Sequence, residues 1–351
     1  MQLVSLTVAV TWGIISTARI NRLFLAGARR AEDVAVVAVA SRDLERGRRF
    51  AAEHGIERVH QDYEALLADP EVEAVYIPLP NAMHIEWTIR ALEHGKHVLC
   101  EKPLSRHPAE VARAYAVAER EGRLLMEAFM YRHHPQTKRL VELVAEGAVG
   151  RLRLVRATFS FRADDPADIR LSRELDGGAL MDVGCYCVSA ARLFAGEPER
   201  VTGVQVLGGG GVDVAFAAAM SFPDDVLAHF DAGLAVAERD ELELVGEEGT
   251  LFIDDPWHIR TPLIELRRGG RVDPIRPPSA DSYQLEIENF SAAIRGRAQA
   301  LLGRADALGQ ARAIEALYRA AGAPRTPAGA PLPGPSGGQA ADPPGPSGAG
   351  Q

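Results

Sequence analysis

Lys102 is the first residue whose position in the chain suggests chemistry. It follows the apolar run HVLC and Glu101, so we expect it at the carboxyl end of a strand, where α/β sheets bind their ligands. Pro103 comes next and pushes the backbone of Lys102 toward extended geometry, which aims its ammonium group. A lysine after a strand is more often a solvated surface charge, so a role for Lys102 depends on its neighbours.

The loop GIISTARIN, from Gly13 to Asn21, is a candidate phosphate-binding turn. It lies between an apolar run and an amphipathic one, but its G-x-G-x-x-G positions hold Ser16, Ala18 and Asn21. Its amides could still face a phosphate from a helix N-terminus, with a nearby hydroxyl as a further donor. An ordinary strand-to-helix turn would explain the same residues. The cofactor-binding candidates here are Gly13, Ile15, Ser16, Thr17, Ala18, Arg19 and Ile20.

The next strand indicates which cofactor is bound. VAVVAVASRD ends in Ser41 and Arg42, whereas NAD enzymes place an Asp or Glu there for the ribose hydroxyls. A hydroxyl and a guanidinium suit a 2′-phosphate, so we predict NADP in preference to NAD. Asp43 is the rival acid, but it stands where the following helix should begin.

A third group of cofactor candidates lies between two later strands. The segment YIPLPNAMHIEWTIRALEHGKHVLCEKPLS supplies Pro78, Leu79, Pro80, Asn81, His84, Glu101 and Lys102. For His84, a position near the nicotinamide and a role as a helix cap or surface group are equally plausible.

Two patterns of elements position these residues. Up to about Met126, short β-branched runs alternate with amphipathic stretches, which predicts an α/β Rossmann domain with a doubly wound parallel sheet. Beyond it, RLRLVRATFSF, DVAFAAAMSF, VLAHFDAGLAV and ELELVG predict an α+β domain with an open, mostly antiparallel sheet. Helices are expected over 178–194, 282–295 and 304–321.

Composition and charge narrow the class of protein. The 351 residues are 47% hydrophobic and 25% charged, and the net charge is -9. Such a chain should be a soluble globular protein without a nucleic-acid or anionic-membrane partner. Three cysteines suggest neither a disulfide framework nor a metal site, so we expect a cytoplasmic protein. The N-terminal run MQLVSLTVAVTW lacks a basic region and is interpreted as a first strand.

The expected domains are a dinucleotide-binding domain over 1–128 and a substrate-binding and dimerisation domain over 129–322. The Pro/Gly-rich tail, 323–351, should be disordered, because it has too few large apolar residues to bury.

Several of these segments together resemble a known family. EKP, PNxxH and GGALMDVGCYC are similar to the glucose–fructose oxidoreductase/inositol dehydrogenase/MocA family of NAD(P)-dependent oxidoreductases, over about residues 10–321. EAFMYRHHPQ and GGALMDVGCYC most resemble its dimeric dihydrodiol dehydrogenases and NADP-dependent D-xylose 1-dehydrogenases, with sugar 3-ketoreductases nearby. The resemblance implies a Rossmann domain, a homodimer formed through the C-terminal sheet, a nicotinamide near the EKP lysine, and often a cis peptide bond before that proline.

The resemblance also implies the catalytic residues Lys102, Asp182 and Tyr186. Tyr186 stands where inositol-type members have His. The i, i+4 spacing places Asp182 and Tyr186 on one face of a helix, so both can reach one substrate hydroxyl. A phenol titrates near pH 10, and we expect the Lys102 ammonium to lower that pKa. Tyr186 would then remove the hydroxyl proton during hydride transfer, with Lys102 as the alternative base.

Further residues follow from their places beside these motifs. His133, His134 and Arg170 are candidate substrate residues, and Cys185 and Cys187 should be packing residues. The predicted function is an NADP-dependent oxidoreductase of a sugar or vicinal diol. The alternatives are a nucleotide-sugar 3-ketoreductase and a catalytically silent NADP(H) sensor.

Overall fold

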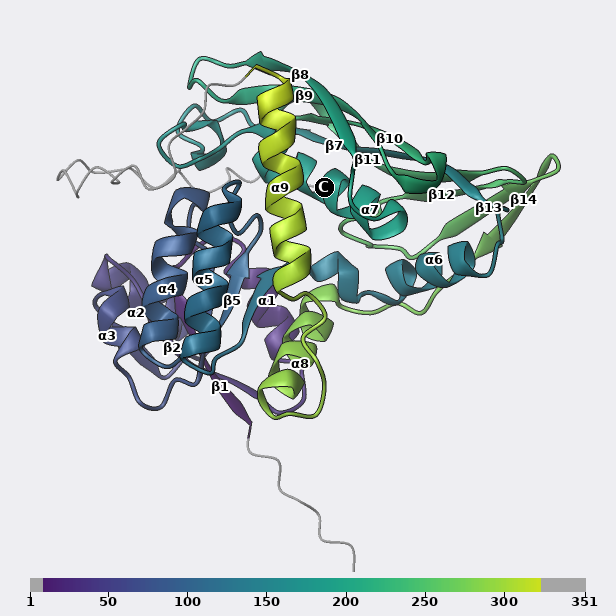
Figure 1. Ribbon diagram of the computed structural model, residues 1–351. Coiled ribbons are helices and arrows are strands. Elements are labelled where there is room, and N and C mark those ends of the chain that lie inside the picture. The colour runs from purple at the N-terminus through teal and green to yellow at the C-terminus, as the bar shows by residue number, and fades with distance from the viewer. Residues whose placement is uncertain (1–8, 323–351) are drawn as a thin grey trace, which may run out of the picture.

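The first half of the chain forms a parallel sheet. The computed structural model describes residues 9–322 (Figure 1). Six strands pair in the order β3-β2-β1-β4-β5-β6, which is the order of a dinucleotide-binding domain, so the predicted Rossmann domain is confirmed. The strands are β1 Val10–Ile15, β2 Val34–Ala40, β3 Arg58–His60, β4 Ala74–Ile77, β5 His97–Glu101 and β6 Leu125–Ala128.

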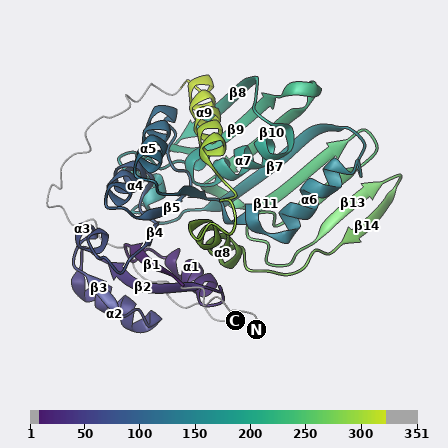
Figure 2. The same cartoon turned by 60° about the horizontal axis from the view of Figure 1, so that its bottom comes forward.

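Helices cover this sheet and explain its apolar strands. They are α1 Asn21–Ala28, α2 Leu44–His54, α3 Tyr63–Leu67, α4 His84–Glu93 and α5 Pro108–Arg120. Every residue of β4 is buried, as expected for a parallel strand that is covered on both faces. α4 packs beside α5, and α1 packs beside the later helix α8 (Ser282–Ile294; Figure 2).

The second half contains an open sheet of eight strands, in the order β14-β13-β12-β11-β7-β10-β9-β8. Its strands are β7 Leu152–Arg162, β8 Arg200–Leu207, β9 Asp213–Ser221, β10 Leu227–Gly233, β11 Ala235–Gly246, β12 Thr250–Asp254, β13 Ile264–Arg268 and β14 Arg271–Ile275. β10 runs parallel to β7 and all other neighbours are antiparallel, which confirms the predicted sheet.

The helices of the second half agree with the predictions except in one detail. They are α6 Pro135–Ala145, α7 Cys185–Ala195, α8 and α9 Arg304–Ala320, with short 3-10 turns at Met130–His133, Ile169–Leu171 and Pro223–Asp225. The helix expected over 178–194 begins instead with a π-helical turn, Leu180–Gly184, which continues into α7.

The two C-terminal helices return to the first sheet. α8 packs against α1, while α9 runs between α5 and β8 (Figure 1). Ala307 and Ala311 of α9 belong to the same apolar cluster as strands β4 and β5. Residues after 300 therefore help to cover the dinucleotide-binding half, although the predicted division places them in the second domain.

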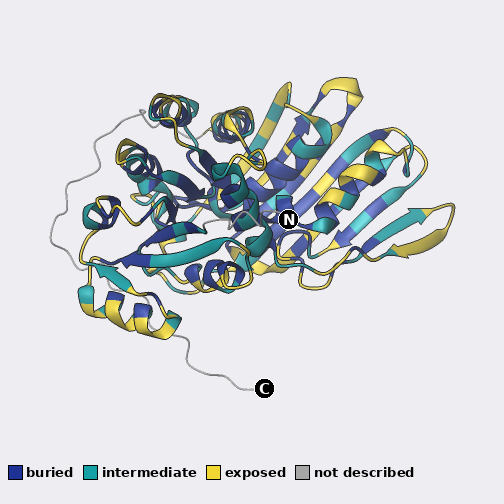
Figure 3. Cartoon of the chain, turned by 90° about the horizontal axis from the view of Figure 1, so that it is seen from below, coloured by how far each residue is buried: buried dark blue, intermediate teal, exposed yellow. Residues whose placement is uncertain are grey.

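Among residues 9–322, the helices lie on one face of the large sheet. α7 packs on β7 and α9 packs on β8, and Figure 3 shows this helical side from below, with largely buried strands behind the helices. Val204, Val206 and Leu227 are exposed on the opposite face. The predicted tail over 323–351 and the beginning of the first predicted strand lie outside the described residues. Between residues 9 and 322, none of the helices has the length and apolar character that a membrane crossing requires.

Candidate active site

Lys102 and Asp182 come from different halves of the chain and meet directly. Lys102 follows β5, and its Nζ donates to the main-chain oxygen of Asp182 at 2.8 Å and lies 3.4 Å from its Oδ1. Arg170 Nε donates to Asp182 Oδ2 at 2.8 Å, while Asp168 binds the same guanidinium through Nη1. Each oxygen of the Asp182 carboxylate thus faces one cationic side chain.

This arrangement keeps both partners charged. Burial raises the pKa of Asp182, but Lys102 and Arg170 outweigh burial and hold it below its usual value. Burial lowers the pKa of Lys102, but Asp182 outweighs that effect and holds it above its usual value. Near neutral pH the pair is therefore an ammonium and a carboxylate, and Lys102 has no free base form to offer.

Tyr186 lies beside Lys102 in an aromatic box. Its ring centroid is 5.5 Å from that of Phe129, 5.4 Å from that of Phe159 and 5.7 Å from that of Trp257. Lys102 Nζ lies 4.9 Å from the ring centroid, which is cation–π geometry. The hydroxyl donates to the sulfur of Met130 at 3.6 Å, a weak bond that a substrate oxygen could replace.

The expected lowering of the Tyr186 pKa is wrong for this structure. Burial raises that pKa well above 10, and the neighbouring Glu101 and Asp182 carboxylates add to the effect. Lys102 lies over the ring face, while the hydroxyl bonds to Met130. The phenol is therefore neutral at physiological pH. In this form it can donate a proton, and it must lose that proton before it can act as a base.

The helix that carries Asp182 and Tyr186 begins with a wide turn. The π-helical segment Leu180–Gly184 accommodates an extra residue relative to an α-helix, and such bulges recur at functional sites. Both side chains still reach Lys102, so the predicted shared face is retained. Cys185 and Cys187 are buried and free, which confirms them as packing residues.

Three side chains fix the backbone around Lys102. His84 contacts the carbonyl oxygen of Pro103 at 2.9 Å, and Glu127 accepts from the amide of Leu104 at 2.8 Å. Tyr76 donates to Glu101 Oε1 at 2.5 Å. The Lys102-Pro103 peptide bond is cis, as the resemblance implied. The turn therefore places the ammonium by contacts on both sides of the proline.

The His84 side chain links the loop after β4 to the loop after β5. Its second ring nitrogen lies 2.8 Å from the carbonyl oxygen of Leu79, so each nitrogen faces a backbone carbonyl. Burial favours the neutral ring and lowers its pKa to about 4. Because both nitrogens face the backbone, His84 supports the cofactor loop and does not offer it a ring nitrogen.

The loop without glycines still has the shape of a phosphate-binding turn. Ser16 has φ 86°, the left-handed conformation that glycine favours, at a cost of about 1–3 kcal/mol. Asn21 holds this conformation by donating to the Ser16 carbonyl at 2.9 Å. Ser16 Oγ and Thr17 Oγ1 are buried without hydrogen-bond partners. Two orphan hydroxyls ahead of α1 fit a bound phosphate.

The end of β2 suits a 2′-phosphate. Ser41 is fully buried and its Oγ accepts from the amide of Asp43 at 3.2 Å, which leaves the hydroxyl hydrogen available. Arg42 is exposed beside it. Asp43 caps α2 by accepting from the amide of Arg46 at 3.0 Å through Oδ1, as predicted.

Gly13 is explained by packing instead of cofactor contact. It lies inside β1, where a Cβ would come within 2.9 Å of Leu66 and 3.0 Å of Val72. Ile15, at the end of the same strand, is fully buried. The remaining cofactor candidates lie where predicted, in the loop before α1, at Pro78, Leu79, Pro80 and Asn81 after β4, and at Glu101 and Lys102 after β5.

The three substrate candidates differ in their surroundings. Arg170 joins the site through Asp182. His134 is buried and caps α6 by accepting from the amide of Gln136, which gives it a structural role. His133 is buried with an unpartnered Nε2, and burial lowers its pKa to about 3. Of the three, Arg170 is the one that contacts a predicted catalytic residue, Asp182.

Sequence reasoning missed two residues of α8. Burial and the neighbouring Tyr186 and Glu101 raise the pKa of Tyr283 well above its usual value. Glu286 is only 1% exposed, one of its oxygens has no partner, and burial raises its pKa well above the usual value. α8 lies a hundred residues beyond Tyr186 in the chain, and its pattern predicts only an amphipathic helix, so no local signal marks either residue.

One group of possible metal ligands occurs among residues 9–322, namely Asp240, Asp255 and His258. His258 Nδ1 lies 2.9 Å from Asp240 Oδ2, and hydrogen bonds to both carboxylates raise its pKa to about 9. Asp255 also accepts from backbone amides of its own loop. These contacts account for the group as an internal ion pair.

Comparison with known proteins agrees with this geometry. A family model described as "Oxidoreductase family, NAD-binding Rossmann fold" matches residues 10–129, and the "GFO/IDH/MocA C-terminal domain" matches residues 137–252. A D-xylose 1-dehydrogenase (NADP(+)) from Haloferax volcanii is 38% identical, over 88% of this chain and 97% of its own length. A trans-1,2-dihydrobenzene-1,2-diol dehydrogenase from Xenopus laevis is 34% identical, over 70% of this chain and 75% of its own.

A solved structure extends the likeness to three dimensions. The 3-ketoreductase from Actinomadura kijaniata, in complex with NADP and TDP-benzene, superposes with a TM-score of 0.83 and 33% identity. The match covers 89% of this chain and 98% of that one.

Proposed function

Because the chain belongs to the GFO/IDH/MocA family of oxidoreductases, we propose that it uses NADP to oxidise or reduce the CH–OH or C=O carbon of a sugar or vicinal diol. The observation that carries this proposal is the contact of Lys102 with Asp182 beside the Tyr186 ring. The contact lies after β5, among the loops that end the parallel strands, where such sheets bind their ligands.

Each side chain has a distinct task in this proposal. A bound nicotinamide supplies the hydride donor or acceptor. The neutral Tyr186 hydroxyl gives its proton to the substrate oxygen as negative charge develops there, and in oxidation the phenolate takes it back. The Lys102 ammonium stabilises the charged oxygen. Asp182 holds that ammonium in place, Arg170 holds Asp182, and neither exchanges a proton itself.

The residues present fit the phosphates of NADP. The hydroxyls of Ser16 and Thr17, in the loop before α1, have no hydrogen-bond partner in the protein and could donate to a phosphate. Ser41 and Arg42 follow β2, where an NAD enzyme would carry an acidic residue. The similar Haloferax enzyme is an NADP(+) dehydrogenase, and the similar Actinomadura structure contains NADP. These features support NADP as the cofactor in preference to NAD.

Replacing Arg42 with alanine should raise the KM for NADP+ by about 10 to 100-fold, because a charge-assisted hydrogen bond contributes roughly 1.5–3 kcal/mol. The KM for NAD+, which lacks the 2′-phosphate, should change less than about threefold. Initial rates with both cofactors test this. Arg48→Ala, an exposed arginine of α2 paired with Glu45, is the matched control. Equal loss for both cofactors would contradict the assignment.

The substrate class is tested by a panel of compounds. Purified protein with NADP+ should produce absorbance at 340 nm with aldoses or trans-diols, as the similar xylose and dihydrodiol dehydrogenases suggest. A dTDP-linked 3-keto sugar with NADPH tests the second candidate, which the likeness to the 3-ketoreductase favours. Binding of NADPH without turnover of any compound would support a silent sensor and refute the proposed enzyme.

We also propose a homodimer through the uncovered face of the large sheet. Val204 and Val206 of β8 and Leu227 of β10 are 69%, 62% and 55% exposed there, beside the small side chains of Ala217 and Ala219. These apolar side chains share the face with the ion pairs Arg156–Glu243 and Arg239–Asp231, and exposed apolar side chains gathered on one face favour an interaction site there. Light scattering after size exclusion should give twice the chain mass.

The three free cysteines agree with the reducing cytoplasm that we propose as the location.

A further inference from the structure

We propose that Asp213 is a positioning residue, which holds the start of the helix that carries Asp182 and Tyr186. Its consequence for catalysis rests on the proposed function. Asp213 is the first residue of β9 and belongs to none of the motifs that identify the active site. It reaches the catalytic helix from the large sheet on which that helix packs.

The contact is short and buried. Asp213 is 2% exposed, and its Oδ2 accepts from the amide of Leu180 at 2.7 Å. Leu180 is the first residue of the π-helical turn, and the first amides of a helix have no partner within it. An N-cap residue normally supplies that acceptor from the chain just before the helix. Here no side chain caps the turn locally, and Asp213 supplies the acceptor instead.

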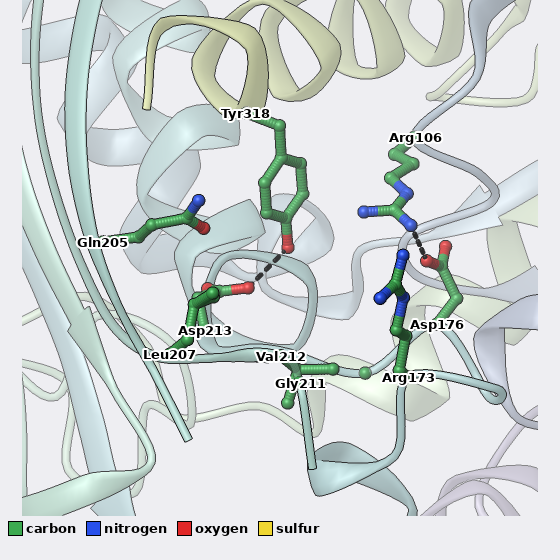
Figure 4. A pocket seen from close by; sticks show the side chains of 10 residues that line it. Arg106, Arg173, Asp176, Gln205, Leu207, Gly211, Val212, Asp213 and Tyr318 are labelled. Atoms are coloured by element: carbon green, nitrogen blue, oxygen red, sulfur yellow. Dashed lines mark hydrogen bonds and ion pairs between the residues drawn. The ribbon is translucent and has the colours of Figure 1, made fainter. Parts of the chain in front are cut away.

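The second oxygen of Asp213 is held from another direction. Oδ1 accepts from the hydroxyl of Tyr318, in α9, at 2.8 Å (Figure 4). Burial raises the pKa of Asp213 to about 6, so the carboxylate is ionised at pH 7.5. A carboxylate forms stronger hydrogen bonds than a neutral acceptor. One charged group thus ties the catalytic helix to the C-terminal helix.

The glycine pair before the helix, Gly177 and Gly178, leaves room for this contact. Gly178 has φ 122°, and a Cβ there would lie 2.2 Å from Asp213 Oδ1. A side chain at 178 would therefore push the carboxylate away from Leu180. The amide of Gly178 donates to the carbonyl of Arg170 at 2.8 Å, which also places the guanidinium that binds Asp182. The position of Arg170, one of the two cationic partners of Asp182, therefore depends on the geometry of this turn.

Asp213 also lines a pocket that is separate from the Lys102 contact. The side chains drawn in Figure 4 include the ion pair of Arg106 with Asp176, at 2.7 Å. Asp176 precedes the glycine pair, and its carbonyl accepts from Asn81, in the loop after β4. The segment before the catalytic helix is therefore fixed to the cofactor loop on one side and to Asp213 on the other.

Three variants test the proposal. Asp213→Ala removes the acceptor, and we expect kcat to fall by about 10 to 100-fold, since a displacement of about 1 Å can reduce a rate a hundredfold. The KM for NADP+ should stay within about threefold of wild type. Asp213→Asn retains an oxygen for Leu180 and should recover most of kcat. Tyr318→Phe removes only the other bond of the carboxylate and should change kcat less than about threefold.

Hydrogen exchange gives a readout that needs no turnover. In Asp213→Ala, amides of residues 178–186 should exchange at least about tenfold faster than in wild type, while those of β2 keep their protection. Faster exchange throughout the chain, or an unchanged rate in 178–186, would overturn the proposal. If no compound is turned over, the proposed function fails but the exchange result stands. If Asp213→Ala does not fold, Asp213→Asn must show intermediate exchange confined to 178–186.

Discussion

Replacing Lys102 with methionine should lower kcat about a thousandfold and leave NADPH affinity within about threefold of wild type. The ammonium is the cation beside Tyr186, and a methionine keeps the length of the side chain but none of its charge. A thousandfold loss corresponds to about 4 kcal/mol of transition-state stabilisation, within the range of a buried electrostatic contact. Steady-state rates and a fluorescence titration of NADPH measure the two quantities.

A double variant distinguishes two causes of the lower kcat: the loss of the Lys102 ammonium from the reaction, and the loss of a cationic partner for Asp182. Removing Lys102 alone leaves the half-buried Asp182 carboxylate with Arg170 as its remaining cationic contact. If that imbalance caused the defect, Lys102→Met combined with Asp182→Asn would recover activity. We expect no recovery, because the ammonium itself is needed. Lys138→Met, an exposed lysine of α6, is the control, and a loss below tenfold in Lys102→Met would contradict the role.

Replacing Tyr186 with phenylalanine should lower kcat by about 100 to 10,000-fold in both directions, the range for losing a general acid or base. The ring remains in its aromatic box, so the fold should be unaffected. Tyr115→Phe, a buried tyrosine of α5, is the matched control. Stopped-flow measurement of NADPH oxidation isolates the chemical step, and an unchanged single-turnover rate would remove Tyr186 from the mechanism.

The raised pKa of Tyr186 gives the wild-type enzyme a direction-dependent pH profile. Below that pKa the phenol holds its proton, so carbonyl reduction should stay nearly constant between pH 7 and 9. Oxidation needs the phenolate, and its kcat/KM should rise about tenfold per pH unit over the same range. The rise should be absent in Tyr186→Phe. A wild-type oxidation rate that levels off below pH 8 would mean that the phenol is more acidic than its buried position indicates.

The sequence predicts the elements of this fold well, because their signals are local. Alternating apolar runs and amphipathic stretches indicate the parallel sheet, and the helix starts at Asp43 and Ser282 agree with the structure. Lys102 was located by its place between a strand and a proline. Asp182 and Tyr186 needed the family resemblance, since an i, i+4 pair is too common to mark a site by itself.

The sequence could not predict features that depend on contacts between distant segments. The Tyr186 pKa is raised by burial and by acidic groups that include Glu101 of β5 and Glu286 of α8, so an argument from Lys102 alone gave the wrong direction. The turn at Ser16 is stabilised by Asn21, which a search for glycines cannot anticipate. Asp213 lies 33 residues beyond Leu180, the residue whose amide it binds, and only the folded chain brings them together.

Direct transfer of hydrogen to the cofactor tests the central claim. The sugar or diol that reacts best in the panel is prepared with deuterium on its carbinol carbon and incubated with NADP+ and the wild-type protein. Mass spectrometry of the product should show NADPH that is one mass unit heavier, because the hydride moves from that carbon. NADPH without deuterium would contradict the account, and so would a complete panel in which no aldose or diol yields NADPH and the dTDP-linked 3-keto sugar consumes none.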